Sequence, residues 1–322
     1  MIRKIKTLVL SILLCIYFNN YLHAQNNIKG EILWTTDWSP SGNYIAVGGN
    51  VDSLHIYSKR GFNLYKSYPM ENTITRTKWH PTENIVAVIT QNSKHESALI
   101  NLATDSILTL TNISEDGARA LDWNYSGEFL AVGDNSGQVA IYNQKGELVK
   151  KFANQEGSTL SITALDWHPS KNLLITVSEK IRMFDMEGNL IKTIKHRPED
   201  ALLLAVAWHK SGEFFVIGDY GYEDVKSLLQ YWSEQGELLK TIDISKAEYR
   251  NLVWNAKGTR LASASDALRI WDKNGKLISE GSSIDNLWGL TWNKRGTRIV
   301  TSSMDQHIIL WNKNAKKLLD IE

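Results

Sequence analysis

A tryptophan recurs at a nearly constant interval along this chain of 322 residues. Successive copies are 41, 44, 44, 41, 46 and 38 residues apart, and they stand at Trp38, Trp79, Trp123, Trp167, Trp208, Trp254 and Trp292. A period in this range is typical of stacked repeats, each of which is too small to bury its own apolar face. The interval therefore restricts the fold to a repeat architecture that takes up most of the chain.

Each repeat contains four short β-rich runs separated by turn residues, as the third copy illustrates. Its first run ends at Trp123, and a four-residue turn that closes with Gly127 leads into a second run at 129–132. A polar loop precedes a third run that ends at 141–142, and a further glycine turn opens a fourth at 148–150. Four antiparallel strands in each of seven repeats predict an all-β fold, a seven-bladed propeller of four-stranded blades.

At this point the repeats resemble the WD40 family. Ile270-Trp271-Asp272 and Leu310-Trp311-Asn312 stand where that family has its Trp-Asp pair. The resemblance extends over residues 33–322, and the blades are expected to start near 33, 74, 118, 162, 203, 249 and 287.

The family also has a Gly-His pair whose histidine bonds a loop aspartate, and this chain lacks the pair, with only His196 near a matching place. The resemblance therefore leaves the buried His-Asp network in doubt, and the loop acids are expected to cap their own turns. These acids are Asp52, Asp134, Glu179, Asp266 and Asp305.

The last repeat continues into residues 317–321, which match the fourth strand of the other copies. We therefore expect the C-terminal segment to supply the last outer strand. Addition of residues 27–32 at that edge is the alternative.

The first 24 residues have the composition of a secretory signal peptide. Arg3, Lys4 and Lys6 precede an apolar run at 7–18, and Ala24 ends the segment. A run of about 12 residues is too short to span a bilayer comfortably. The sequence thus predicts export to the periplasm or the medium, with a mature propeller over 25–322 and no membrane span once the signal is removed. An uncleaved anchor is the alternative.

Composition and motifs argue against catalysis and against nucleic acid. Lys and Arg number 36 and Asp and Glu 35, so the chain has no basic excess that would attract a polyanion. Motifs for zinc hydrolysis, phosphate binding and a nucleophile elbow are all missing from the sequence. We therefore predict no enzyme activity, no cofactor and no metal.

Two sets of polar residues flank the tryptophan column. Asp37, Asp122 and Asp166 directly precede it and could bind a cation, but Lys78 interrupts the set, so carboxylates that bond nearby backbone are the expected interpretation. Three histidines directly follow the column, and a role in the turn is expected for them: His80, His168 and His209.

Trp34 and Trp288 are the two tryptophans that the repeat does not place in the core. Each stands four residues before a column tryptophan, in a set that reads Trp34, Thr75, Arg119, Thr163, Leu204, Arg250 and Trp288. The resemblance implies that this position opens onto the channel mouth of the face used for partners. Closure of the ring makes Trp34 and Trp288 neighbours, with Met304 beside them.

Two enlarged loops are expected on the same rim, at 91–97 and at 219–226, the second of which contains Tyr220 and Tyr222. The sequence thus predicts a monomeric, exported, non-catalytic scaffold that binds a protein or peptide. Its expected contact residues are Trp34, Arg119, Tyr220, Tyr222, Arg250, Trp288 and Met304. The alternatives are a propeller that acts as an enzyme or binds a small ligand or metal, a structural module of a cell-envelope assembly, and a mouth that the two tryptophans merely fill.

Overall fold

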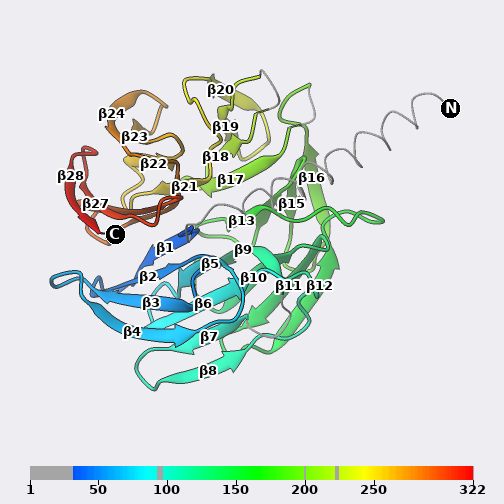
Figure 1. Cartoon of the computed structure of the whole chain (residues 1–322). Helices are drawn as coiled ribbons and strands as arrows, with labels where there is room; N and C mark the ends of the chain where they lie inside the picture. The colour runs from blue at the N-terminus through cyan, green and yellow to red at the C-terminus, as the bar shows by residue number, and fades with distance from the viewer. Residues whose placement is uncertain (1–31, 93–96, 199–200, 222–224, 322) are drawn as a thin grey trace. The chain divides into compact units, whose positions relative to one another are not determined.

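The computed structural model describes residues 32–92, 97–198, 201–221 and 225–321. These residues form seven four-stranded antiparallel sheets and no helix, and the sheets surround a common centre (Figure 1). The predicted all-β, seven-bladed propeller is confirmed. The predicted signal peptide and residues 25–31 lie outside the described part of the chain. No described helix is long and apolar enough to cross a membrane.

Each blade runs from an inner strand to an outer strand in chain order. The inner strands are β1 (Thr35–Trp38), β5 (Ile74–Trp79), β9 (Ala118–Trp123), β13 (Ala164–Trp167), β17 (Leu203–Trp208), β21 (Asn251–Trp254) and β25 (Leu287–Trp292). The second strands are β2 (Tyr44–Gly48), β6 (Ile85–Thr90), β10 (Phe129–Asp134), β14 (Leu174–Val177), β18 (Phe214–Asp219), β22 (Arg260–Ala264) and β26 (Arg298–Ser303).

The third strands are β3 (Ser53–Ser58), β7 (Ala98–Asn101), β11 (Gln138–Asn143), β15 (Ile181–Phe184), β19 (Leu229–Ser233), β23 (Ala267–Asp272) and β27 (Ile308–Asn312). The outer strands are β4 (Leu64–Pro69), β8 (Ser106–Thr109), β12 (Leu148–Ala153), β16 (Leu190–Ile194), β20 (Leu238–Ile242), β24 (Leu277–Ser282) and β28 (Lys317–Ile321).

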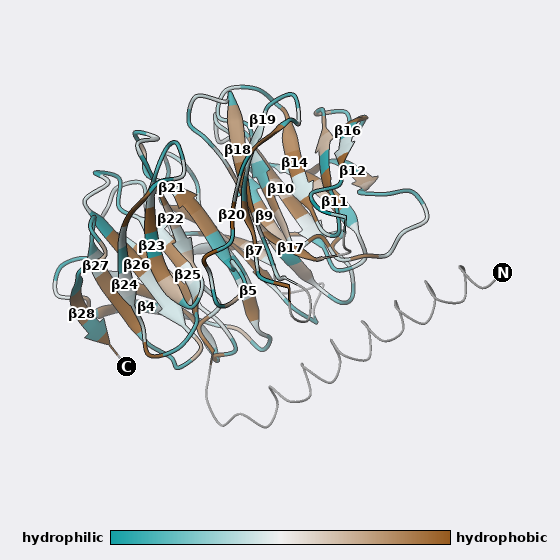
Figure 2. Cartoon of the chain, turned by 90° about the horizontal axis from the view of Figure 1, so that it is seen from above, coloured by the Kyte–Doolittle hydropathy of each residue, from teal (hydrophilic) through white to brown (hydrophobic). Residues whose placement is uncertain are grey.

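The hydrophobic core lies between blades. One apolar cluster, for example, joins Ala87 and Ile89 of β6 to Trp123 of β9 and Leu130 of β10. The middle strands are mostly apolar because both of their faces are covered, and Figure 2 shows this as brown segments. Since each blade buries its face against the next, the blades stabilise one another instead of folding one by one.

The turn after the column tryptophan also links blades. His80 Nε2 lies 2.9 Å from the carbonyl oxygen of Gly127 in the next blade, and His168 Nε2 lies 3.2 Å from that of Gly212. Both glycines have left-handed backbones, with φ of 78° and 75°. A Cβ on Gly127 would lie 2.4 Å from His80 Nε2, so these glycines serve the histidine as well as the turn. The predicted turn role of the histidines is confirmed, and the structure adds a bond between blades.

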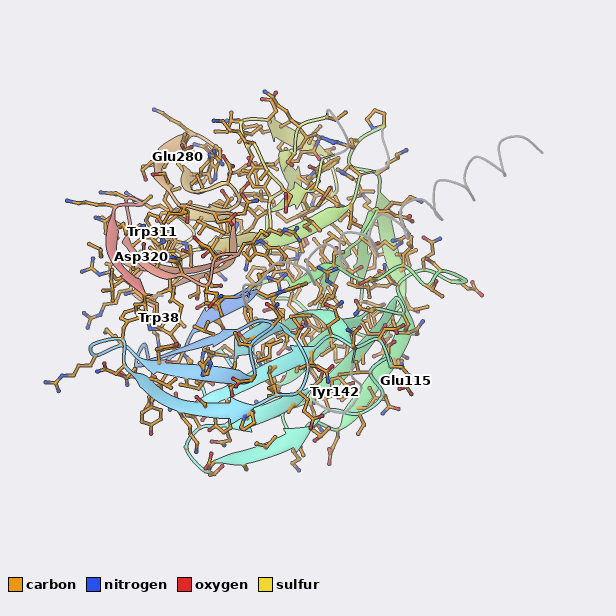
Figure 3. All side chains as sticks on the ribbon, viewed as in Figure 1. Trp38, Glu115, Tyr142, Glu280, Trp311 and Asp320 are labelled. Atoms are coloured by element: carbon orange, nitrogen blue, oxygen red, sulfur yellow. The ribbon has the colours of Figure 1, made fainter. Side chains whose placement is uncertain are left out.

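The ring closes between the first and last blades. Strand β28 pairs with β27, so the prediction that the C-terminal segment forms the last outer strand is confirmed. Across the seam, the backbone N–H of Trp38 donates to Thr291 Oγ1 at 3.1 Å, and the N–H of Leu33 donates to the Ser303 carbonyl at 3.2 Å. Figure 3 shows Trp38 where the first blade meets the last, which carries the labelled Trp311.

The loop acids differ in their partners, and Asp266 bonds Arg269 Nη1 at 2.8 Å instead of capping its own turn. Asp134 caps its own turn as expected, because its Oδ1 accepts from the backbone N–H of Ser136 at 3.0 Å. In the fifth blade, however, a buried histidine and a loop aspartate do come close together. His196 Nε2 lies 3.3 Å from Asp219 Oδ2, and Arg197 Nε lies equally close to that oxygen. Asp219 is fully buried, so the two basic side chains compensate a charge that water cannot reach.

Candidate binding site at the channel mouth

Trp34 and Trp288 meet at the start of the inner strands. Trp34 immediately precedes β1 and Trp288 belongs to β25, and their ring centroids lie 4.7 Å apart with an interplanar angle of 70°. This edge-to-face contact is the one that closure of the ring predicts from the sequence spacing. Trp288 is buried and Trp34 half-buried, so the pair forms a floor with one ring still in reach of solvent.

Two arginines of the same column stack on these rings. The guanidinium carbon of Arg119, in β9, lies 5.4 Å from the Trp34 ring centroid. That of Arg250, next to β21, lies 4.1 Å from the Trp288 ring. Each such contact contributes about 0.5–2 kcal/mol, with the larger value in desolvated settings. Glu248 holds Arg250 in this position, because its Oε1 accepts from Arg250 Nε at 2.8 Å.

The enlarged loop of the fifth blade reaches the same place. Tyr220 is 41% exposed, and its ring centroid lies 6.0 Å from the guanidinium carbon of Arg250. Tyr222 lies outside the described residues, as does most of the other enlarged loop, at 93–96. Met304 is half-buried, and its backbone N–H donates to the Asn286 carbonyl at 3.1 Å. The rings of Trp34 and Trp288 contact each other and the guanidiniums of Arg119 and Arg250.

The threonines of the column have structural roles. Thr75 Oγ1 donates to the Ala118 carbonyl at 2.6 Å, and Thr163 Oγ1 donates to the Leu203 carbonyl at 2.5 Å. Each bond joins one inner strand to that of the next blade. The column therefore divides into hydroxyls that hold the ring together and large side chains that surround the mouth.

Arg76 is a mouth residue that the sequence analysis missed. It lines a cavity of about 30 Å³ together with Arg119, Arg250 and the two tryptophans. Arg76 stands three residues before its column tryptophan, whereas the predicted mouth residues stand four before it. A signal was present there, because this position is otherwise occupied by smaller residues: Thr35, Ala120, Ala164, Ala205, Asn251 and Gly289.

The environment of the mouth disfavours the charged form of its arginines. Burial lowers the pKa of Arg76 to about 10, and the nearby charge of Arg250 acts in the same direction. Burial also lowers the pKa of Arg119 to about 10, with smaller contributions from Arg250 and Arg76. The fold thus holds three guanidiniums close enough to repel one another, where solvent screens them poorly.

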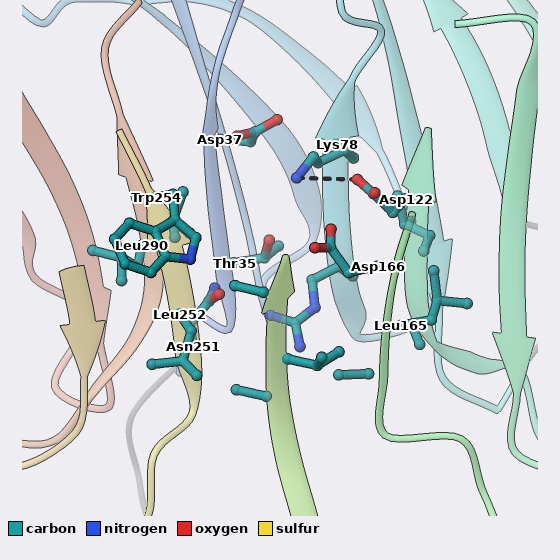
Figure 4. Close-up of a pocket in the computed structure, with 18 of the residues that line it drawn as sticks. Thr35, Asp37, Lys78, Asp122, Leu165, Asp166, Asn251, Leu252, Trp254 and Leu290 are labelled. Carbon is teal, nitrogen blue, oxygen red and sulfur yellow. Dashed lines mark ion pairs between the residues drawn. The ribbon is translucent and has the colours of Figure 1, made fainter. Parts of the chain in front are cut away.

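Deeper in the channel, a cavity of about 110 Å³ contains the acids that precede the tryptophan column. Figure 4 shows Lys78 pointing toward Asp122, with Nζ 3.2 Å from Oδ1, and Asp37 and Asp166 near them. The charge of Asp122 raises the pKa of Lys78, whereas burial raises the pKa of Asp37 and of Asp166.

These acids bond the next blade, as the sequence analysis expected. Each accepts from the backbone N–H of the following column tryptophan, in the pairs Asp37–Trp79 (2.7 Å), Asp122–Trp167 (3.2 Å) and Asp166–Trp208 (2.6 Å). Among the described residues, no group of three or more His, Cys, Asp or Glu side chains is placed to hold a metal ion.

Comparison with known proteins agrees with this architecture. The model of the family described as WDR19 first beta-propeller matches residues 34–203, and that of the WD domain, G-beta repeat, matches residues 275–312. The chain belongs to this family of WD40-repeat propellers. It is 31% identical over 164 residues to WD repeat-containing protein 19 of Mus musculus, a match that covers 50% of the chain and 12% of that protein.

More distant relatives match a larger share of the WD40 chain. Eukaryotic translation initiation factor 3 subunit I of Sclerotinia sclerotiorum is 22% identical over 198 residues, which cover 58% of each protein. Retinoblastoma-binding-like protein E of Dictyostelium discoideum is 20% identical over 248 residues, which cover 68% of the chain and 47% of that protein. The chain thus spans less than two thirds of the length of these relatives.

Proposed function

We propose that this WD40 propeller is an exported, non-catalytic scaffold that binds a protein or peptide over the channel mouth. The observation that carries the proposal is the cluster of Trp34, Trp288, Arg119 and Arg250 around one cavity. Tryptophan and arginine are the residues most enriched in the energetic centres of protein interfaces, because they combine a large apolar area with polar atoms. Tyr220 extends the surface outward on the adjoining loop.

The family supports a binding role. WD40 propellers are generally scaffolds that bind protein partners, and the relatives include a subunit of a translation factor and a protein named for retinoblastoma binding. The sequence supports export, because the basic start, short apolar run and small residue at Ala24 have the order of a signal peptide. Mass spectrometry of the native protein is expected to find Gln25 at the N-terminus. A native chain that still begins at Met1 would contradict this.

The binding face can be tested with the Trp34→Ala, Trp288→Ala double variant. We expect capture of partners from envelope and secreted fractions to be lost, because truncation of one such anchor costs about 2 kcal/mol or more. Circular dichroism would establish that the variant is folded. Tyr125→Ala is the matched control, since Tyr125 is an exposed aromatic residue in the turn at the other end of β9. Undiminished capture by a folded double variant would rule out this face.

A further inference from the structure

The mouth cavity is surrounded by cations that come from separate blades. Arg76 belongs to β5, Arg119 to β9, and Arg250 directly precedes β21. All three line the same cavity of about 30 Å³, and its described lining includes no carboxylate. Glu248 lies outside this lining and bonds Arg250. The cavity is therefore rich in positive charge contributed by side chains that the fold itself brings together.

The remaining lining groups add donors and apolar surface. The hydroxyls of Thr75 and Thr163 already donate to backbone carbonyls of neighbouring blades. The indole N–H groups of Trp34 and Trp288 are buried and have no acceptor among the described residues. Six other tryptophans also lack an acceptor for this group, so the guanidiniums carry most of the argument. A ligand for this cavity must bring acceptor atoms and negative charge.

Without a bound anion, the three neighbouring guanidiniums destabilise the folded protein. The pKa values of Arg76 and Arg119 fall to about 10 because burial and neighbouring guanidiniums both oppose their charge. Cations held close together in this way reduce stability, a pattern typical of sites kept for binding. An anion between them would remove the repulsion and replace it with charge-assisted hydrogen bonds.

The size of the cavity limits the anion. A water-sized atom needs about 10–15 Å³ of such space, so the cavity accepts about two or three of them. That is enough for the two oxygens of a carboxylate, which a guanidinium can bind with two parallel hydrogen bonds. The edges of Trp34 and Trp288 would then contact the aliphatic carbons behind the carboxylate.

We propose that the mouth recognises a carboxylate of its protein partner, with Arg76 as a central binding residue. This rests on the proposed function and adds the chemistry of the recognised group. The carboxylate can come from an Asp or Glu side chain or from the C-terminus of the partner, and both present the same two oxygens to the guanidiniums.

Pools of synthetic pentapeptides passed over the immobilised full chain distinguish these sources. One pool has free C-termini and no acidic side chain, and the other three are amidated with Glu, Gln or phosphoserine at the centre. We expect retention of the free-carboxylate pool or the Glu pool to exceed that of the Gln pool by about tenfold, since charge-assisted bonds are stronger than neutral ones. The pool that is retained identifies the source.

Substitution of Arg76 tests the residue assignment. Arg76→Gln should lower retention of the preferred pool by about tenfold, and Arg76→Lys should restore part of it, because Lys keeps the charge and loses the planar fork. Arg295→Gln is the matched control, as Arg295 is exposed in the turn after Trp292, at the other end of the inner strand. In the free protein, Arg76→Gln should not lower the unfolding temperature, because it relieves repulsion.

The outcomes separate this proposal from the proposed function. Equal retention of the free-carboxylate, Glu and Gln pools, lost in the Trp34→Ala, Trp288→Ala variant, overturns carboxylate recognition and leaves the binding face standing. A preference for the phosphoserine pool over both carboxylate pools overturns it in favour of phosphate. If no pool is retained, the unfolding temperature in sodium acetate, relative to sodium chloride at equal ionic strength, decides. A higher unfolding temperature in acetate that Arg76→Gln abolishes supports the proposal. An unchanged unfolding temperature in acetate overturns it.

Discussion

The histidines after the tryptophan column show how one side chain can join two blades. His80 Nδ1 accepts from the backbone N–H of Glu83 at 3.0 Å, while Nε2 faces the Gly127 carbonyl at 2.9 Å. Only the neutral ring with its proton on Nε2 satisfies both contacts, because a proton on Nδ1 would oppose the N–H. His168 and His209 repeat this arrangement with the N–H of Ser170 and of Ser211.

This geometry predicts a loss of stability at acid pH. Burial lowers the pKa of His80, His168 and His209, so the unfolded chain takes up protons first. The three histidines therefore contribute fully to folding stability above about pH 6.5, which is the pKa of histidine in the unfolded chain. This stability is lost as the pH falls from there through the lower pKa of the folded protein. The urea midpoint should decrease between pH 7.5 and pH 5.

Asparagine is the substitution that isolates the effect, because Asn124, Asn255 and Asn293 occupy the same turn position in three other blades. The triple His→Asn variant should be less stable at pH 7.5 by about 1 kcal/mol for each lost hydrogen bond, with a shallower dependence on pH. His55→Asn should keep the wild-type slope, since His55 bonds Ser67 within its own blade. A triple variant with the wild-type slope would contradict this account.

The inner strands were the elements most readily predicted from the sequence. Their tryptophans recur with the blade period, and the buried positions around them repeat, so the sheets can be predicted from the sequence spacing. The same spacing predicts the contact between Trp34 and Trp288. Arg76 does not follow from this spacing, because the repeat places mouth residues four and six before the tryptophan. Its side chain reaches the mouth from position three, a consequence of its length that periodicity does not encode.

Loops between second and third strands were harder to predict. Their lengths differ from blade to blade, and the partners of their side chains are distant in sequence. The buried trio of His196, Arg197 and Asp219 is an example, since about 20 residues separate the bases from the acid. The departure from the family pattern put such a group in doubt, because the Gly-His pair is absent. Burial of Asp219 requires compensating charge whatever the local motif, and Arg197 helps to provide it.

At the scale of the molecule, the ring has no terminal blade. Repeat proteins in which contacts join only neighbours unfold from their ends unless the ends are stabilised. Here Thr291 Oγ1 lies 3.0 Å from Asp37 Oδ1 and accepts from the N–H of Trp38, so the seam contains bonds of the kind that join the other inner strands. The seam should therefore unfold together with the rest of the ring.

Two buried threonines test this equivalence. Thr291 lies at the seam, and Thr163 bonds the Leu203 carbonyl between the fourth and fifth blades. Thr291→Val and Thr163→Val should each lower the free energy of unfolding by about 1–3 kcal/mol, because each leaves buried groups without a partner. Both variants should keep one urea transition with the wild-type slope, since every interface belongs to the same cooperative unit. A second transition, or a reduced slope, in Thr291→Val alone would mean that the ring opens at its seam and that the blades behave as a linear stack.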